Sequence, residues 1–185
     1  MVRSSNLRRP THFKTKKMDY SEKFVQFIKG IKKTDRVALF HDVDGDGIPA
    51  AAITINALKR LGIKVHLVLG RGRGEITPSE ETIKELQLNK IDFLITLDKP
   101  TDKDPKALRE ISRFAKVLVV DHHSNEGKID VDEDRVLIFK PQFFSDVPFR
   151  YLSFQVLLVK TFPWNTFRAP DQDKGPTCQL GQDPL

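Results

Sequence analysis

The distribution of hydrophobic residues along the chain predicts strands that alternate with helices. Short, nearly continuous apolar runs are typical of strands covered on both faces, whereas apolar residues at three- and four-residue spacing are typical of amphipathic helices. The runs predict strands at residues 36–40, 64–69, 91–97, 116–120 and 135–139. The helical spacing predicts helices at residues 18–31, 48–61, 78–88 and 106–114, and a helix or strand–helix segment at 149–160.

Local signals mark the ends of two of these helices. Pro49 lies in the first turn of helix 48–61, where its missing amide hydrogen costs little, and Gly62 follows the last residue. Ser79 is placed to cap helix 78–88. Strands that alternate with helices of crossover length predict an α/β fold, with a parallel, Rossmann-like sheet of about five strands and helices on both faces.

The chain divides into three parts by composition. Residues 1–17 contain arginines and lysines but no acidic residue, which predicts a flexible basic arm. Residues 18–162 contain all the predicted strands and helices and form the expected domain. Residues 163–185 hold four prolines and no periodic apolar pattern, which predicts an irregular tail.

Charge and composition narrow the class of protein. The net charge is +6, and a basic arm attracts polyanions, chiefly nucleic acid, although a solvated tail explains the same charges. No apolar run reaches the length of a membrane span, and the N-terminus lacks the apolar core of a signal peptide. The lone cysteine, Cys178, fits a reducing compartment, so we expect a cytoplasmic protein without a membrane partner.

The first predicted strand ends in a dense cluster of acidic residues. In the segment RVALFHDVDGDG, residues 36–47, Asp42, Asp44 and Asp46 occupy alternate positions. Carboxylates this close together repel one another, and no neighbouring segment supplies obvious compensating positive charge. We therefore expect a bound cation at this end of the strand.

Two more predicted strands end in metal-ligating side chains. Strand 91–97 is followed by Asp98, and the next strand by Asp121, His122 and His123. Asp98 by itself could merely cap a turn. If the three strands are parallel neighbours, however, their ends meet in one crevice, where open α/β sheets bind ligands. Imidazole beside carboxylates suits Mn²⁺ better than Ca²⁺.

Two other interpretations of the acidic cluster fit less well. An EF-hand loop matches the first six positions of DVDGDG, but its twelfth position is Ile53 in place of glutamate, and a strand precedes it. The cluster also resembles the aspartate loop of haloacid-dehalogenase-type phosphatases, with Asp42 as nucleophile and Asp44 as acid. That pattern wants threonine or valine where Asp46 stands, and it predicts no histidine pair, so it is a minor alternative.

The ordered set of motifs is similar to the DHH phosphoesterase superfamily. The match covers roughly residues 36–127, and the form DVDGDG followed by Ala50 and Ala51 most resembles the RecJ-type exonuclease branch. This resemblance implies an α/β catalytic domain and a Mn²⁺-dependent phosphoesterase, with two ions and with Mg²⁺ as the alternative metal. The implied substrate is single-stranded nucleic acid or a short oligonucleotide, cut by a two-metal mechanism.

The resemblance also implies a role for each motif residue. The metal ligands would be Asp42, Asp44, Asp46, Asp98 and His122, and Asp46 and Asp98 would bridge the two ions. The implied catalytic residues are His123, which would face the scissile phosphate, and Asp121, which would support the histidines. The role of His41 is open.

A glycine-rich segment offers a second candidate for phosphate binding. The sequence GRGRGE, residues 70–75, predicts a loop in which Arg71 and Arg73 could bind the substrate. It does not match GxGxxG, so a solvated turn is the alternative.

The chain departs from the family pattern after the histidine pair. The family carries a further aspartate and then a smaller substrate-binding domain. Asp146 follows the histidines too soon, and Asp171 and Asp173 lie in the proline-rich tail. We therefore expect an incomplete, truncated catalytic domain, whose second domain could come from a partner chain. A catalytically impaired nucleic-acid-binding subunit and a small-nucleotide or polyphosphate phosphatase are the alternatives.

Overall fold

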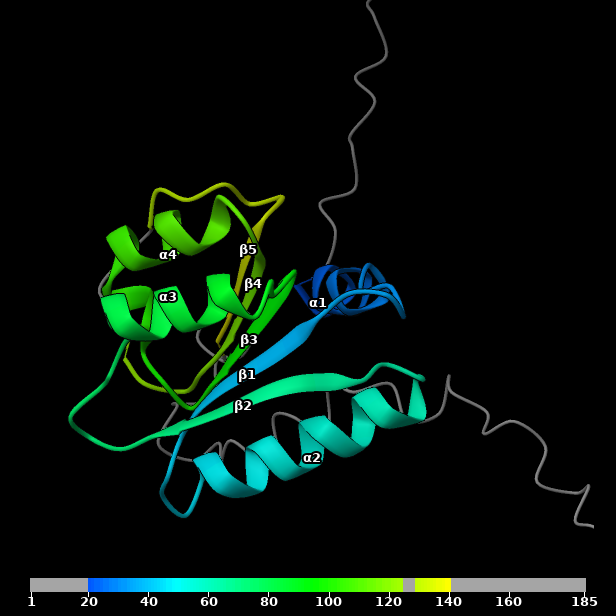
Figure 1. Cartoon of the computed structure of the whole chain (residues 1–185), viewed down its shortest axis with the longest axis horizontal. Helices are drawn as coiled ribbons and strands as arrows, with labels where there is room; N and C mark the ends of the chain where they lie inside the picture. Colours follow the sequence, from blue (N-terminus) through cyan, green and yellow to red (C-terminus); the bar gives the residue numbers. More distant parts are fainter. Residues whose placement is uncertain (1–19, 125–128, 141–185) are drawn as a thin grey trace, which may run out of the picture.

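The fold is a single parallel sheet between two layers of helices (Figure 1). The structure, a computed structural model, describes residues 20–124 and 129–140. Within them the strands are β1 (Val37–Asp42), β2 (Val65–Arg71), β3 (Phe93–Leu97), β4 (Lys116–Val120) and β5 (Val136–Phe139). Their order is β2-β1-β3-β4-β5, and every neighbouring pair is parallel. The predicted fold class, with its five parallel strands, is confirmed.

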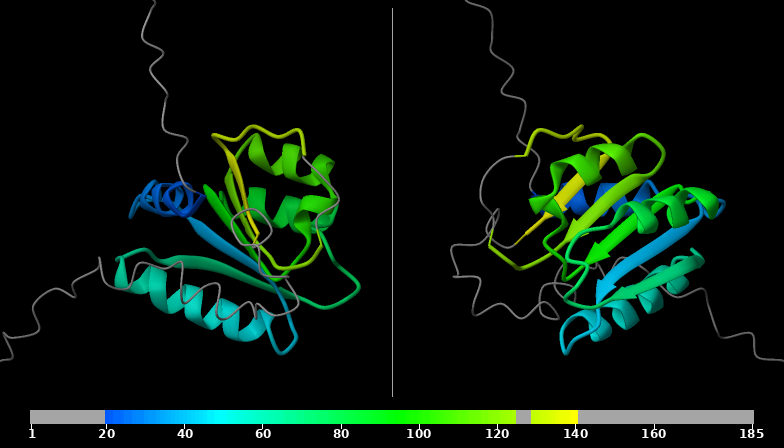
Figure 2. Two further views of the ribbon diagram at one scale, coloured as in Figure 1. Left: turned by 180° about the vertical axis from the view of Figure 1, so that it is seen from behind. Right: turned by 60° about the vertical axis from the view of Figure 1, so that its left-hand side comes forward.

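Helices cover both faces of the sheet, as the sequence predicts. The helical elements are α1 (Tyr20–Lys29), α2 (Gly47–Arg60), α3 (Glu80–Leu88), a short 3₁₀ turn η1 (Thr101–Lys103) and α4 (Pro105–Ser112). In Figure 2, α3 and α4 lie together on one side of the sheet and α2 on the other. The packing of α1 places it on the same face as α2. No helix among the described residues is long and apolar enough to cross a membrane.

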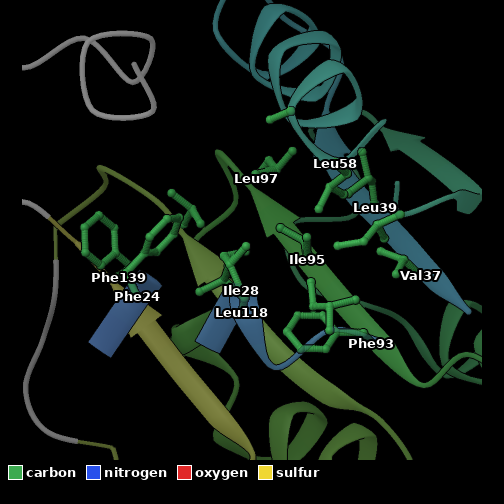
Figure 3. Close-up of a cluster of buried hydrophobic side chains, with 14 of the residues drawn as sticks. Phe24, Ile28, Val37, Leu39, Leu58, Phe93, Ile95, Leu97, Leu118 and Phe139 are labelled. Atoms are coloured by element: carbon green, nitrogen blue, oxygen red, sulfur yellow. The ribbon is translucent and has the colours of Figure 1, made fainter. Parts of the chain in front are cut away.

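Each strand contributes alternate side chains to two separate cores. In β1, Val37 and Leu39 face α1 and α2, in the cluster that also contains Phe24 (Figure 3). The intervening Ala38 and Phe40 pack toward α3 and α4. Because both faces of the central strands are covered, all four of these strand positions are fully buried. This two-sided burial explains why the strands appear in the sequence as continuous apolar runs.

Several element boundaries differ from the predicted ones. β1 continues through His41 and Asp42, and β2 continues through Gly70 and Arg71, so the predicted loop at residues 70–75 begins as strand. The two extensions pair with each other, His41 with Gly70 and Asp42 with Arg71. These paired residues are polar or lack an apolar side chain, so they do not extend the apolar runs. The hydrophobic pattern therefore predicted the ends of β1 and β2 too early.

The polar segment at residues 99–105 connects β3 to α4. It contains η1 and the first residue of α4, Pro105, whose helix is capped by the Asp104 side chain accepting from Ala107 N. The predicted segment at 149–160, the arm at 1–17 and the tail at 163–185 lie outside the described residues.

The chain changes direction next to β1. It passes from β1 through α2 to β2 on one side, and then returns through α3 to β3 on the other side of β1. Such a reversal leaves a crevice at the carboxyl ends of the strands, where ligands bind in open α/β sheets. Residues His41, Leu97 and Val120 are level with one another in β1, β3 and β4. The acidic residue that follows each of them therefore reaches the same edge, as predicted.

Candidate metal centre

The turn from β1 into α2 depends on a glycine and on one aspartate. A Cβ atom on Gly47 would lie 2.3 Å from the backbone oxygen of Asp42, so the helix can begin this close to the strand only with glycine. Asp44 Oδ1 accepts hydrogen bonds from Gly47 N at 2.9 Å and Asp46 N at 3.1 Å. The bond from Gly47 is the main cause that lowers the pKa of Asp44, so this carboxylate remains ionised at the start of α2.

Asp98 and His122 form a close pair at the ends of β3 and β4. Asp98 has a left-handed backbone, φ 56°, and is only 2% exposed. Its Oδ1 lies 3.0 Å from His122 Nε2. Burial raises the pKa of Asp98, and the negative charge of Asp44 adds to this effect, while His122 opposes it. The hydrogen bond with Asp98 raises the pKa of His122.

Asp121 and His123 form a second pair beside the first. Asp121 is fully buried, and its Oδ1 lies 2.7 Å from Nδ1 of the half-exposed His123. Burial by itself would raise the pKa of Asp121, but the hydrogen bond with His123 and the charge of Lys140 outweigh it, and the net shift is downward. The bond to Asp121 in turn raises the pKa of His123.

Three of these side chains are close enough to share one ion. One potential ligand atom from each of Asp98, His122 and His123 lies within 4.8 Å of the other two. Asp44 and Asp46 are near enough to affect this cluster, because Asp44 raises the pKa of Asp98 and Asp46 that of His122. Carboxylate and imidazole donors together fit a divalent ion such as Mn²⁺.

Asp42 has a different partner, Lys99. This lysine is 1% exposed, and its Nζ lies 3.6 Å from Asp42 Oδ1. The same ammonium donates to the backbone oxygens of Gly72 at 3.1 Å and Glu75 at 2.8 Å. Lys99 therefore ties the loop between β2 and α3 to the acidic edge of the sheet.

A second buried lysine, Lys140, also reaches this edge. Its Nζ lies 2.9 Å from Asp121 Oδ2 and 2.7 Å from Asp102 Oδ2. The expectation that only a bound cation supplies positive charge here is therefore wrong. Lys99 follows one strand-end aspartate and Lys140 follows β5 directly, so the parallel sheet brings both to the edge that holds the carboxylates. A lysine immediately after a strand end is the sequence signal that could have found them.

Comparison with protein families shows to which family the chain belongs. The family described as DHH family, N-terminal domain, matches residues 36–145, more than half of the chain. The chain belongs to the DHH family. The match contains both strand-end pairs, Asp98 with His122 and Asp121 with His123.

Solved structures share this DHH fold at low sequence identity. The exonuclease RecJ bound to manganese superposes with a TM-score of 0.59 at 20% identity, covering 83% of this chain and 40% of the RecJ chain. RecJ from Thermus thermophilus in complex with Mn²⁺ superposes with a TM-score of 0.56 at 21% identity, covering 82% of this chain and 22% of the RecJ chain. The chain thus spans less than half the length of either. A search of curated proteins finds no match.

Among the described residues, the other candidates, Arg71, Arg73 and His41, are not members of the group that could share one ion. The Arg71 guanidinium is 3.2 Å from Glu75 and 3.0 Å from Glu85, while Arg73 is exposed. Their binding of substrate stays a prediction. His41 is buried, with Nδ1 2.6 Å from the backbone oxygen of Asp42. The three later aspartates considered as a further ligand are outside the described residues: Asp146, Asp171 and Asp173.

Proposed function

We propose that this DHH chain is a metal-dependent phosphoesterase that hydrolyses phosphodiester bonds in single-stranded nucleic acid or short oligonucleotides. The observation that carries the proposal is the convergence of Asp98, His122 and His123, from the ends of β3 and β4, at the sheet edge beside the chain reversal. The family membership supports it. The two solved RecJ proteins, an exonuclease and a Mn²⁺ complex by their descriptions, support the choice of substrate class and metal.

The donor set at this edge fits divalent metal ions. We propose that Asp42, Asp44, Asp46, Asp98 and His122 hold two Mn²⁺ ions, with Mg²⁺ as the alternative. Such ions, when bound, neutralise phosphoryl oxygens and lower the pKa of an attacking water. Asp44 is suited to this role because its lowered pKa keeps it ionised. His122 must lose its proton to ligate, so the metal competes with the proton that Asp98 stabilises.

The neighbouring residues are proposed to handle the substrate. His123 presents Nε2 to a phosphoryl oxygen, because its Nδ1 is engaged by Asp121. The raised pKa of His123 favours the protonated ring, which can donate a hydrogen bond to an anionic oxygen. Arg71, at the end of β2, and Arg73, on the loop that Lys99 holds against the sheet, would contact further phosphates. The arm at residues 1–17 would add a non-specific attraction for the polyanion.

The rest of the binding surface is proposed to come from elsewhere. The chain spans 40% and 22% of the two RecJ chains, so a second domain or a partner chain would select the substrate. We propose that residues 18–162 form the catalytic unit, between the basic arm and the proline-rich tail.

The test is hydrolysis of an end-labelled single-stranded oligonucleotide with Mn²⁺ or Mg²⁺. We expect Asp98→Asn to lower the rate at least about 100-fold, since it removes a proposed ligand and the partner of His122. Asp134→Asn, an exposed aspartate away from the edge, is the matched control and should retain the wild-type rate. Absence of cleavage with either metal across the pH range, or equal cleavage by Asp98→Asn, would refute the proposal.

One observation favours a second candidate function. The carboxylate of Asp42 faces the ammonium of Lys99, which lessens its need for a metal ion. A chain with this arrangement could bind nucleic acid without cleaving it, as a subunit of a larger complex. Calorimetric titration separates the two, because two tight Mn²⁺ ions followed by turnover favour the enzyme. A parallel panel of mononucleotides and inorganic polyphosphate would identify a small-molecule phosphatase.

A further inference from the structure

Lys140 is a buried charged residue that the proposed reaction does not use. It follows β5, and its side chain is 0% exposed. Three acceptors surround its Nζ: Asp102 Oδ2 at 2.7 Å, Asp121 Oδ2 at 2.9 Å and the backbone oxygen of His123 at 3.2 Å. The two carboxylate contacts are ion pairs, and the hydrogen bond goes to the backbone oxygen of His123. Asp102, which comes from η1, is buried as well.

Stability alone does not explain this arrangement. Burying an ammonium and two carboxylates carries a desolvation penalty, and well-packed apolar residues of similar volume are often as stable or more so. The chain nevertheless places Lys140 and Asp102, from separate elements, around the single motif residue Asp121. Asp121 is hydrogen-bonded to His123, so this placement affects the imidazole of His123.

Asp121 is held at both of its oxygen atoms. Oδ2 faces Lys140 and Oδ1 faces His123 Nδ1 at 2.7 Å. The contact of Oδ2 with Lys140 fixes the orientation of the Asp121 carboxylate. Its other oxygen, Oδ1, therefore stays directed toward the imidazole of His123. Lys140 also bonds the backbone of His123 directly, so it restrains that residue through both its main chain and its ring. A carboxylate bonded to Nδ1 keeps the hydrogen on that nitrogen and leaves Nε2 for a metal or substrate.

We propose that Lys140, held in place by Asp102, is a positioning residue that sets the orientation and tautomer of His123 through Asp121. The inference rests on the proposed function in so far as His123 acts on the phosphate. The orientation itself is a property of the metal-free protein, so it is measured without turnover.

The first measurement is the ¹⁵N spectrum of the histidine side chains in metal-free protein, at an alkaline pH where the imidazoles are neutral. Wild type should show His123 with its hydrogen on Nδ1. Lys140→Met should move these shifts toward the average of the two tautomers that free imidazole shows, whereas Lys140→Arg should preserve the wild-type pattern. Lys84→Met, at an exposed site on α3, is the matched control and should change nothing.

The second measurement is kinetic. Loss of a residue that orients a functional histidine typically lowers activity by about 10–100-fold, and we expect this fall in kcat for Lys140→Met with little change in KM. Lys140→Arg should retain most of the wild-type kcat. If wild type hydrolyses no oligonucleotide, the proposed function fails, but the spectra still decide whether Lys140 positions His123.

A second variant covers the case in which Lys140→Met does not fold. Removing the lysine alone leaves two buried carboxylates without their partner, whereas the double variant Asp102→Asn with Lys140→Met removes one charge of each sign. The double variant should show the same shift of the His123 ¹⁵N signals toward the average of the two tautomers. Wild-type nitrogen shifts in either folded variant overturn the inference. So does a wild-type spectrum in which His123 already averages between tautomers.

Discussion

At the scale of single residues, two glycines of the same motif differ in the space around them. Gly47 lies where α2 begins over the end of β1, and a Cβ atom there would collide with backbone atoms of Asp42. Gly45, two positions earlier, has nothing within 4 Å of the place a Cβ would take. The motif therefore needs its second glycine for a close approach of the backbone and has no steric need for its first.

These two positions make a matched pair of variants. We expect Gly47→Ala to lower the free energy of unfolding by about 3 kcal/mol, because a clash with backbone atoms has no rotamer change to relieve it. It should also weaken Mn²⁺ binding, since Asp42 and Asp44 would shift. Gly45→Ala should stay within about 0.5 kcal/mol of wild type. Urea denaturation measures both, and equal stability of the two variants would contradict the argument.

The two histidines predict a pH dependence of stability in the metal-free protein. Asp98 raises the pKa of His122, and Asp121 raises that of His123. A group whose pKa is higher in the folded state stabilises the fold fully below its unfolded value, here 6.5, and loses that contribution as the pH rises through the folded value. We therefore expect the free energy of unfolding to fall as the pH rises from about 6 through the raised pKa values.

The measurement is urea denaturation in the presence of a chelator at a series of pH values. The double variant His122→Gln with His123→Gln should lack this decrease, because it has no imidazole to titrate at the site. Persistence of the same slope in the variant would show that other groups cause it.

At the scale of elements, the candidate site is made from strand ends and from the loops held against them. Arg71 ends β2 and Arg73 lies on the loop between β2 and α3. The ammonium of Lys99 bonds two backbone oxygens of this loop, those of Gly72 and Glu75. Glu75 in turn accepts from Thr82 of α3 at 2.6 Å. One buried lysine after β3 thus connects three elements.

Loss of the Lys99 ammonium should release this loop. We expect Lys99→Met to destabilise the fold by about 1–3 kcal/mol, because it leaves two partly buried backbone oxygens and the Asp42 carboxylate without the ammonium. Amide hydrogen exchange should increase at residues 72–75 more than in the strands. Lys84→Met, on the exposed face of α3, should alter neither quantity. Unchanged exchange in the Lys99 variant would show that the loop is held by its other contacts.

At the scale of the whole molecule, the order of the strands assembles the site. The order β2-β1-β3-β4-β5 makes β1, β3 and β4 neighbours, so three acidic strand ends that are distant in the chain lie along one edge. Any ion bound there joins segments from most of the sheet. Binding should therefore stabilise the entire cooperative unit and not only a loop.

Mn²⁺ should raise the thermal unfolding midpoint of wild type. At about 100 times the dissociation constant, a ligand that binds only the folded state contributes about 2.7 kcal/mol. The variant His122→Gln should show little of this shift, whereas His66→Gln, on β2 away from the cluster, should respond to Mn²⁺ as wild type does. Differential scanning calorimetry with and without the metal measures the difference. An equal shift in His122→Gln would place the ion elsewhere.

Much of this protein is determined by its sequence alone. Continuous apolar runs predict the buried strands, because burial on both faces excludes polar residues, and three-to-four spacing predicts the helices that cover them. The acidic and histidine residues at the ends of β1, β3 and β4 are local signals as well, since each motif lies where its strand ends. These features are properties of short segments, so a reader of the sequence can recognise them.

Only the tertiary structure decided which charges meet. The extensions of β1 and β2 depend on backbone pairing between them, and Lys99 and Lys140 reach the acidic edge because of the strand order. Asp42 faces a lysine, whereas Asp98 faces a histidine, although both lie at the carboxyl ends of neighbouring strands. Electrostatic partners are set by distances between segments far apart in the chain, and those distances exist only once the sheet is assembled.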